Sequence, residues 1–135
     1  MTERPGEMTD AARAEQGMKV RREVLGDQHV DRAGYGTTEF TAPFQDLITR
    51  YAWGEIWSRP GLPRAERSMI TIAMLAALRQ EHELALHLRA GLRNGLTQEQ
   101  IQEILLQVAV YAGVPAANRA FAIAQRVLAE EEITG

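Results

Sequence analysis

The sequence predicts an all-α protein, and three observations carry that prediction. Apolar residues recur with the spacing of a helix face in six segments, and no segment alternates with the period of two that a strand requires. Helix start and stop signals separate those segments. The 135 residues, 45% hydrophobic and 24% charged, have the ordinary composition of a globular protein. We therefore expect a flexible tail over residues 1–8 and a single domain of about six helices over residues 9–135.

The first expected helix spans residues 10–25. Thr9 can cap it, because a threonine hydroxyl accepts a hydrogen bond from the first turn, and Gly26 is a stop signal. Residues 28–41 contain two glycines and a pair of threonines, which favours an ordered loop over a helix. We expect this loop to pack through three of its larger side chains, His29, Tyr35 and Phe40.

The next two expected helices occupy the middle of the chain. Pro43 favours a helix start, and the pattern continues over residues 42–57 with apolar side chains on one face. These side chains are Phe44, Leu47, Ile48, Tyr51 and Ala52. Residues 58–61 break the pattern, and a new helix starts over residues 62–67. It is apolar nearly all round from residue 69 to 78, which predicts a central, buried helix.

Three further helices are expected in the C-terminal half. One runs over residues 80–95, where an Asn-Gly pair ends it. Thr97 and Gln100 have the spacing of a capping box at the start of the next helix, which Gly113 ends. Its expected buried side chains are Ile101, Ile104, Leu105, Val108 and Ala109. The last helix covers residues 116–131.

Charge and cysteine content exclude several classes of function. The net charge of −3 argues against general affinity for nucleic acid or anionic membranes. Without cysteine there is no disulfide, thiolate metal site or cysteine nucleophile. No apolar signal segment opens the chain and no apolar run reaches the length of a membrane span. We expect a cytoplasmic protein with neither nucleic-acid nor membrane partners.

Glu83 and His87 are the first candidates for chemistry. They lie four residues apart on one helix face, and Gln80 lies one turn earlier on the same stripe. A carboxylate beside an imidazole can transfer a proton near neutral pH, although such pairs are also common on exposed faces. His82 and His87 are five residues apart, roughly 140° round a helix, so one ion cannot easily bind both. We expect no metal.

Arg67 is the candidate cation. It precedes Ile70 and Met74 on a stripe expected to point inward. A guanidinium there could bind an anionic group, or its stem could cover apolar surface while the charged head stays in water.

The segments after residue 16 resemble the carboxymuconolactone decarboxylases. The string TIAMLAALRQEHELALHLRAGLRNGLTQEQIQEILLQVAVYAGVPAANRAFAIAQ carries most of the resemblance, and VLGDQHVDRA and FTAPFQDLITRYAWGEIWSRPGL fit the same family. The resemblance covers roughly residues 17–128. It implies an AhpD-like helical bundle and a homo-oligomer built from dimers, commonly a hexamer. The redox branch of that superfamily carries a Cys-x-x-Cys pair, whose positions hold Gln80 and Glu83 here and cannot form a disulfide.

The resemblance also implies an activity. Family members of this kind decarboxylate an unsaturated five-membered dicarboxylate lactone of the β-ketoadipate pathway of protocatechuate catabolism, without a cofactor. On that basis we hypothesise that Arg67 clamps a substrate carboxylate, that His87 delivers a proton, and that Glu83 orients His87.

The remaining roles are less defined. His82 or Gln80 is a candidate donor to the enolate oxygen. Relatives commonly carry histidine where this chain has Arg119, which becomes a candidate for binding the substrate anion. Two alternatives stay open: a superfamily member acting on another small lactone or keto acid, and a non-catalytic helical oligomer. A helix-turn-helix reader over residues 97–113 is disfavoured by its acidic side chains.

Overall fold

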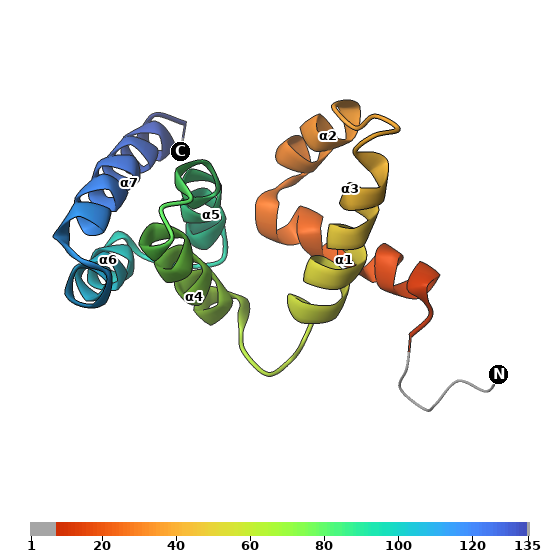
Figure 1. Cartoon of the computed structure of the whole chain (residues 1–135), viewed down its shortest axis with the longest axis horizontal. Coiled ribbons are helices and arrows are strands. Elements are labelled where there is room, and N and C mark those ends of the chain that lie inside the picture. The colour runs from red at the N-terminus through yellow and green to blue at the C-terminus, as the bar shows by residue number, and fades with distance from the viewer. Residues whose placement is uncertain (1–7, 135) are drawn as a thin grey trace. The chain divides into compact units, whose positions relative to one another are not determined.

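The computed structural model describes residues 8–134, in which helices joined by short turns are the regular structure and no strand occurs. The all-α prediction is confirmed. The chain divides into two compact units, Met1–Leu62 and Pro63–Gly135, which are described separately (Figure 1). The tail predicted over residues 1–8 lies outside the described part except for Met8, and the single domain stays a prediction.

The helices follow one another with short connections. In the first unit they are α1 (Asp10–Leu25), α2 (Asp27–Tyr35), α3 (Ala42–Ile48) and the π-helix η1 (Thr49–Ile56). In the second they are α4 (Arg64–Ala77), α5 (Glu81–Arg93), α6 (Gln98–Ala112) and α7 (Val114–Thr134). None of the described helices has both the length and the apolar character needed to cross a membrane.

The prediction of a loop over residues 28–41 is wrong for its first half, which forms α2. Asp27 lies in the first turn of α2, where a negative charge stabilises the positive end of the helix dipole, and it pairs with Arg22 of α1 at 3.1 Å. Val30 of the same helix is buried. The glycines that suggested a loop lie at the end of this helix, where glycine is tolerated. Tyr35 and Phe40 were expected to pack but are 90% and 92% exposed.

The helix predicted over residues 42–57 forms, but its second half is a π-helix. The Trp57 N–H donates to the Ala52 carbonyl oxygen at 2.9 Å, five residues back. The packing face is also not the predicted one, because Thr49, Trp53 and Gly54 are buried against α1 while the predicted face is largely exposed. The exposed members of that face are Phe44, Leu47 and Tyr51.

Glycines explain the choice of face. A Cβ placed on Gly17 of α1 would lie 2.0 Å from the Thr49 carbonyl oxygen, and one on Gly54 would lie 2.3 Å from the Arg13 carbonyl oxygen. The backbones of α1 and η1 therefore approach closely where neither helix carries a side chain. Trp53 and Trp57 stack beside this contact, with ring centroids 5.1 Å apart.

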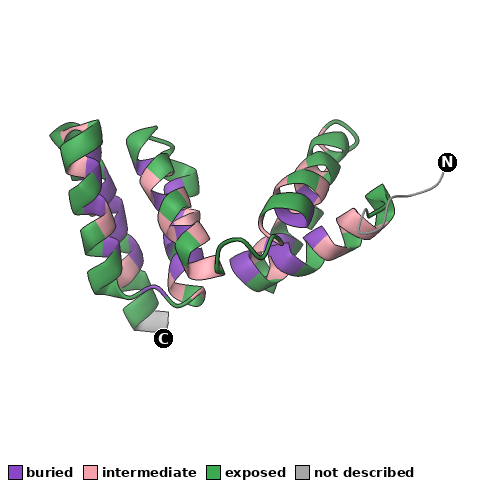
Figure 2. Ribbon diagram, turned by 90° about the horizontal axis from the view of Figure 1, so that it is seen from below, coloured by how far each residue is buried: buried purple, intermediate pink, exposed green. Residues whose placement is uncertain are grey.

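The second unit encloses one apolar core between its four helices (Figure 2). The capping box of α6 is present: the Gln100 N–H donates to Thr97 Oγ1 at 3.1 Å, and the Thr97 N–H donates to Gln100 Oε1 at 2.9 Å. The core contains Ile72, Ala76, Leu84, Leu88, Ile101, Leu105, Val108, Ile123 and Val127, with Ile104 and Ala109 packed at its edge.

The prediction that α4 is buried all round is wrong. Ile72 and Ala76 are buried, whereas Met74 is 52% exposed and Leu78 is exposed at the end of the helix. Since α5, α6 and α7 all contact α4 from its core side, the apolar residues on its other face are left at the surface of this structure.

Candidate functional site

A tight turn joins α4 to α5 and fixes where the candidate residues begin. The Gln80 N–H donates to the Leu75 carbonyl oxygen at 2.9 Å, and the Arg79 N–H donates to the Ala76 carbonyl oxygen at 3.2 Å. This is the hydrogen-bond pattern of a Schellman motif, in which glycine usually takes the left-handed position. Here Arg79 takes it with φ of 59°, and Gln80 then caps α5.

Glu83 and His87 share one flank of α5, as the spacing predicted. They are roughly 40° apart round the helix axis at 3.6 residues per turn. Leu84 and Leu88 are buried beside them, so this flank borders the core. Glu83 is exposed, whereas His87 is half-buried and its Nδ1 atom is buried. An exposed carboxylate thus lies one turn from an imidazole at the edge of the core.

Arg119 of α7 reaches α5, but at another residue. Its Nε and Nη2 donate to Glu81 Oε1 and Oε2 at 2.8 and 3.0 Å, forming a bidentate ion pair. These hydrogen bonds lower the pKa of Glu81, and Glu81 in turn raises the pKa of Arg119. Glu81 and Glu83 are roughly 160° apart round the helix. Arg119 therefore does not share a flank with Glu83 and His87.

Arg67 lies in the first turn of α4, at the other end of the α4–α5 pair. Its neighbour Ser68 is buried and accepts a hydrogen bond from Asn94 Nδ2 at 2.9 Å, so this turn lies beside the end of α5. Along α5, Asn94 is about 10 Å from His87 and about 16 Å from Glu83 at about 1.5 Å per residue. Along α5, Arg67 therefore starts nearer to the level of His87 than to that of Glu83.

The other two candidates lie at the start of α5. Gln80 shares the flank of Glu83 and His87, being roughly 20° from His87 round the helix. His82 is exposed and lies on the opposite side from the buried Leu84 and Leu88. On this helical projection Gln80, the N-cap of α5, groups with Glu83 and His87, and His82 lies apart from them.

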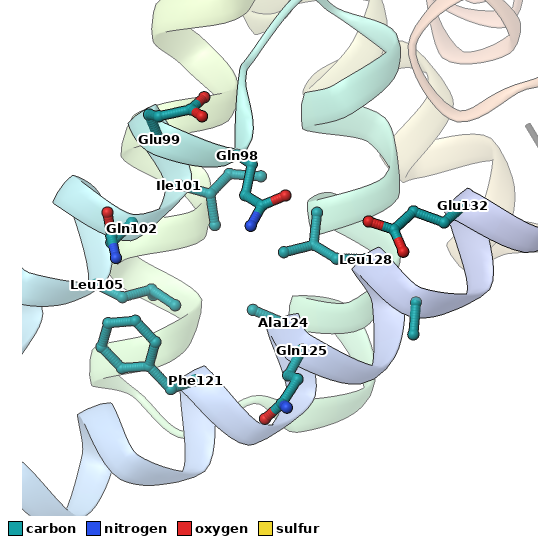
Figure 3. A pocket seen from close by; sticks show the side chains of 11 residues that line it. Gln98, Glu99, Ile101, Gln102, Leu105, Phe121, Ala124, Gln125, Leu128 and Glu132 are labelled. Carbon is teal, nitrogen blue, oxygen red and sulfur yellow. The ribbon is translucent and has the colours of Figure 1, made fainter.

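The cavity between α6 and α7 contains none of these candidates. It has a volume of about 430 Å³, with Leu105 and Phe121 in its apolar wall and Glu99 and Glu132 at its ends (Figure 3). No group of three or more histidine, aspartate and glutamate residues in the described part of the chain could hold a metal ion. The expectation of no metal stays a prediction.

Sequence reasoning missed two residues that organise the turn. They are Glu81, whose carboxylate pairs with Arg119, and Arg79, which takes the left-handed position. A helical projection would have placed Glu81 and Glu83 on opposite sides of α5 and so separated their roles. Nothing in the sequence marks Arg79 as a left-handed residue, because glycine is the usual signal for that conformation.

Comparisons with known proteins match this chain to decarboxylases. The model of the carboxymuconolactone decarboxylase family matches residues 42–126, which include every candidate named above. The 4-carboxymuconolactone decarboxylase of Acinetobacter baylyi is 50% identical over 89% of this chain and 90% of its own length. The nitrosuccinic acid decarboxylase of Metarhizium robertsii is 41% identical over 84% of this chain and 80% of its own length.

Proposed function

Because the chain belongs to the carboxymuconolactone decarboxylase family, we propose that it converts 4-carboxymuconolactone into 3-oxoadipate enol-lactone and carbon dioxide. The observation that carries this proposal is 50% identity to a 4-carboxymuconolactone decarboxylase over nearly the whole of both chains. From this identity we infer a carboxy-lyase that acts on a small dicarboxylate lactone of protocatechuate catabolism.

The substrate itself can accept the electrons that decarboxylation releases. The departing carboxylate is γ to the lactone carbonyl through a carbon–carbon double bond. When the bond to the carboxylate breaks, its electron pair moves into that carbonyl and gives a dienolate. A proton delivered to the carbon next to the carbonyl completes the enol-lactone. The protein must therefore hold a dianion, favour the enolate oxygen and deliver one proton.

The α5 flank of Gln80, Glu83 and His87 supports the proton-delivery part of this proposal. His87 is half-buried at the edge of the core with its Nδ1 atom inside, and imidazole is the side-chain group most often used to deliver a proton in catalysis. Glu83 lies one turn away on the same flank, which supports its proposed role of orienting His87. Gln80 on the same flank has an amide N–H that could donate to the enolate oxygen.

The proposed anion-binding roles have less geometric support. Arg67 is half-buried beside the end of α5, so the substrate and the long arginine side chain together would have to span the distance to His87. Arg119 already donates from both Nε and Nη2 to the Glu81 carboxylate. It would have to release that carboxylate to bind a substrate through the same two nitrogens. His82 lies away from the His87 flank. We retain Arg67 as the proposed clamp.

A nitro acid is a second candidate substrate, since one relative is a nitrosuccinic acid decarboxylase. A nitro group next to the scissile bond can also accept the released electron pair, so both reactions ask the protein for the same proton delivery.

Homo-oligomeric assembly and a cytoplasmic location also remain proposals. The exposed apolar side chains of Met74, Val110 and Tyr111 support assembly.

The test is conversion of 4-carboxymuconolactone, generated in situ from 3-carboxymuconate by its cycloisomerase. Ultraviolet absorbance and released carbon dioxide are followed together, with a chelator present and with the cycloisomerase alone as the control for spontaneous decay. Conversion well above that control supports the proposal. Folded protein that converts neither this lactone nor nitrosuccinate would reject both candidate substrates.

A further inference from the structure

Arg21 is a buried cation in the first unit. It lies on α1 and is only 6% exposed, although arginine is rarely buried without an acidic partner. Its Nη1 donates to Gln45 Oε1 at 3.1 Å and to Thr49 Oγ1 at 3.4 Å. Both acceptors are uncharged, so these hydrogen bonds leave the positive charge of the guanidinium uncompensated.

No carboxylate in the described part of the chain pairs with Arg21. Burial lowers the pKa of Arg21. The carboxylate closest in sequence to its partners, Asp46, accepts from Arg50 Nε at 2.9 Å. By contrast, the neighbouring Arg22 forms ion pairs with Asp27 and Asp31 at 3.1 and 2.9 Å. A buried charge of this kind is costly unless an anion approaches it.

A cavity of about 200 Å³ lies beside Arg21, between α1, α2 and α3. Its lining residues are Met18, Arg21, Val30, Gly34, Thr37, Gln45, Asp46 and Thr49. The apolar members come from α1 and α2, and most of the polar ones from α3 and the start of η1. The cavity therefore has one apolar side and one side with hydrogen-bonding groups.

One edge of the Arg21 guanidinium is unused. Both hydrogen bonds of the side chain come from Nη1, and Nε is buried without a hydrogen bond, so Nη2 is the nitrogen that a ligand can reach. Arg119 shows what the Nε–Nη2 edge does elsewhere in this protein, since it holds both oxygens of the Glu81 carboxylate. Gln45 accepts from Arg21 through its oxygen, so its amide NH₂ is a second donor group beside the same cavity.

We propose that this cavity binds a small monocarboxylate, held by the Nη2 group of Arg21 and by the Gln45 amide. Guanidinium and carboxylate match in geometry and charge, and Val30 and Met18 offer contacts to a short apolar tail. Asp46 in the lining disfavours a second negative charge on the ligand. The chemical class is that of acetate or propionate rather than a di- or trianion.

The test uses the full chain and ¹³C-acetate, followed by NMR at constant ionic strength set with sodium chloride. An acetate ion has few atoms, so we expect a dissociation constant of about a millimolar or weaker. We expect saturable binding and a nuclear Overhauser effect between the acetate methyl and the Val30 methyl groups. Absence of saturable binding to folded wild-type protein overturns the proposal. This outcome includes the case in which a carboxylate side chain of the protein already fills the site and excludes acetate.

Two variants form a matched pair. Arg21→Lys keeps the charge but removes the planar guanidinium and its Nη2 donor, so acetate should bind at least about tenfold more weakly. Arg22→Lys makes the same change at the next residue, where the guanidinium already has acidic partners, and should leave acetate binding unchanged. Equal weakening in both variants would overturn the assignment. The wild-type contact to Val30 decides the question if Arg21→Lys does not fold.

Discussion

Replacing Gly17 by alanine tests the close approach that organises the first unit. An ideal Cβ at this position lies 2.0 Å from the Thr49 carbonyl oxygen, and ordinary contact begins at 3.4 Å. The added Cβ and this oxygen are therefore 1.4 Å short of ordinary contact, the difference between these distances, so the two backbones must move apart. The atom in the way belongs to the backbone, so rotation of a side chain cannot relieve the clash.

The magnitude follows from two opposing effects. Alanine favours a helix over glycine by about 1 kcal/mol, which would stabilise the variant. Overpacking costs about 1–3 kcal/mol, with the upper end appropriate for a backbone clash. We expect a net loss of about 2 kcal/mol in the free energy of unfolding. Gly34→Ala is the matched control, since a Cβ there meets nothing within 4 Å. It should gain about 0.5–1 kcal/mol.

The assay is urea unfolding followed by tryptophan fluorescence. Both tryptophans of the chain, Trp53 and Trp57, stack within the first unit, so the signal reports on that unit. The Gly17→Ala midpoint should fall and the Gly34→Ala midpoint should rise. A Gly17→Ala protein that is as stable as Gly34→Ala would refute the close packing of α1 on η1.

Three further predictions concern the second unit. Arg119→Gln should raise the lowered pKa of Glu81 toward the usual glutamate range in a ¹³C NMR titration, because Arg119 is the main cause of the lowering. The stability from this pair is present above the usual range and is lost as the pH falls through the lowered pKa. No change in the Glu81 titration would contradict the ion pair. Arg79→Gly should raise the free energy of unfolding by about 0.5–1 kcal/mol, because glycine adopts the left-handed conformation freely. A lower free energy of unfolding for Arg79→Gly, measured by chemical denaturation, would contradict the left-handed conformation at this position. Gly95→Ala, at φ of 102°, should cost about 1–2 kcal/mol although no atom blocks its Cβ, and an unchanged thermal midpoint would argue against this backbone conformation.

Local signals in the sequence predicted the helix ends well. Thr9 and Thr97 cap their helices as expected, because capping depends on side chains within one turn of the backbone groups they satisfy. Glycine was a less certain guide. Gly34 suggested a loop, but it lies in the last turn of α2, and the buried Val30 anchors this helix.

Long-range partners were harder to predict. The flank of Glu83 and His87 followed from helix periodicity, whereas the pairing of Glu81 with Arg119 joins residues 38 positions apart and needs the packing of α7 on α5. Arg21 was overlooked because it stands beside Arg22 in a charged stretch. Its spacing from the buried Gly17 and Val24 does place it on the packed stripe of α1, a signal that could have found it.

The most direct test of the central claim compares carbon dioxide release from 4-carboxymuconolactone by wild type, His87→Asn and His29→Asn. His29 lies on α2 in the other unit and controls for loss of a histidine as such. We predict rapid release by wild type and His29→Asn, and a rate lowered about 10²–10⁴-fold in a folded His87→Asn protein, since proton delivery contributes about that factor. Full activity of His87→Asn, or no release by wild type, would contradict the account.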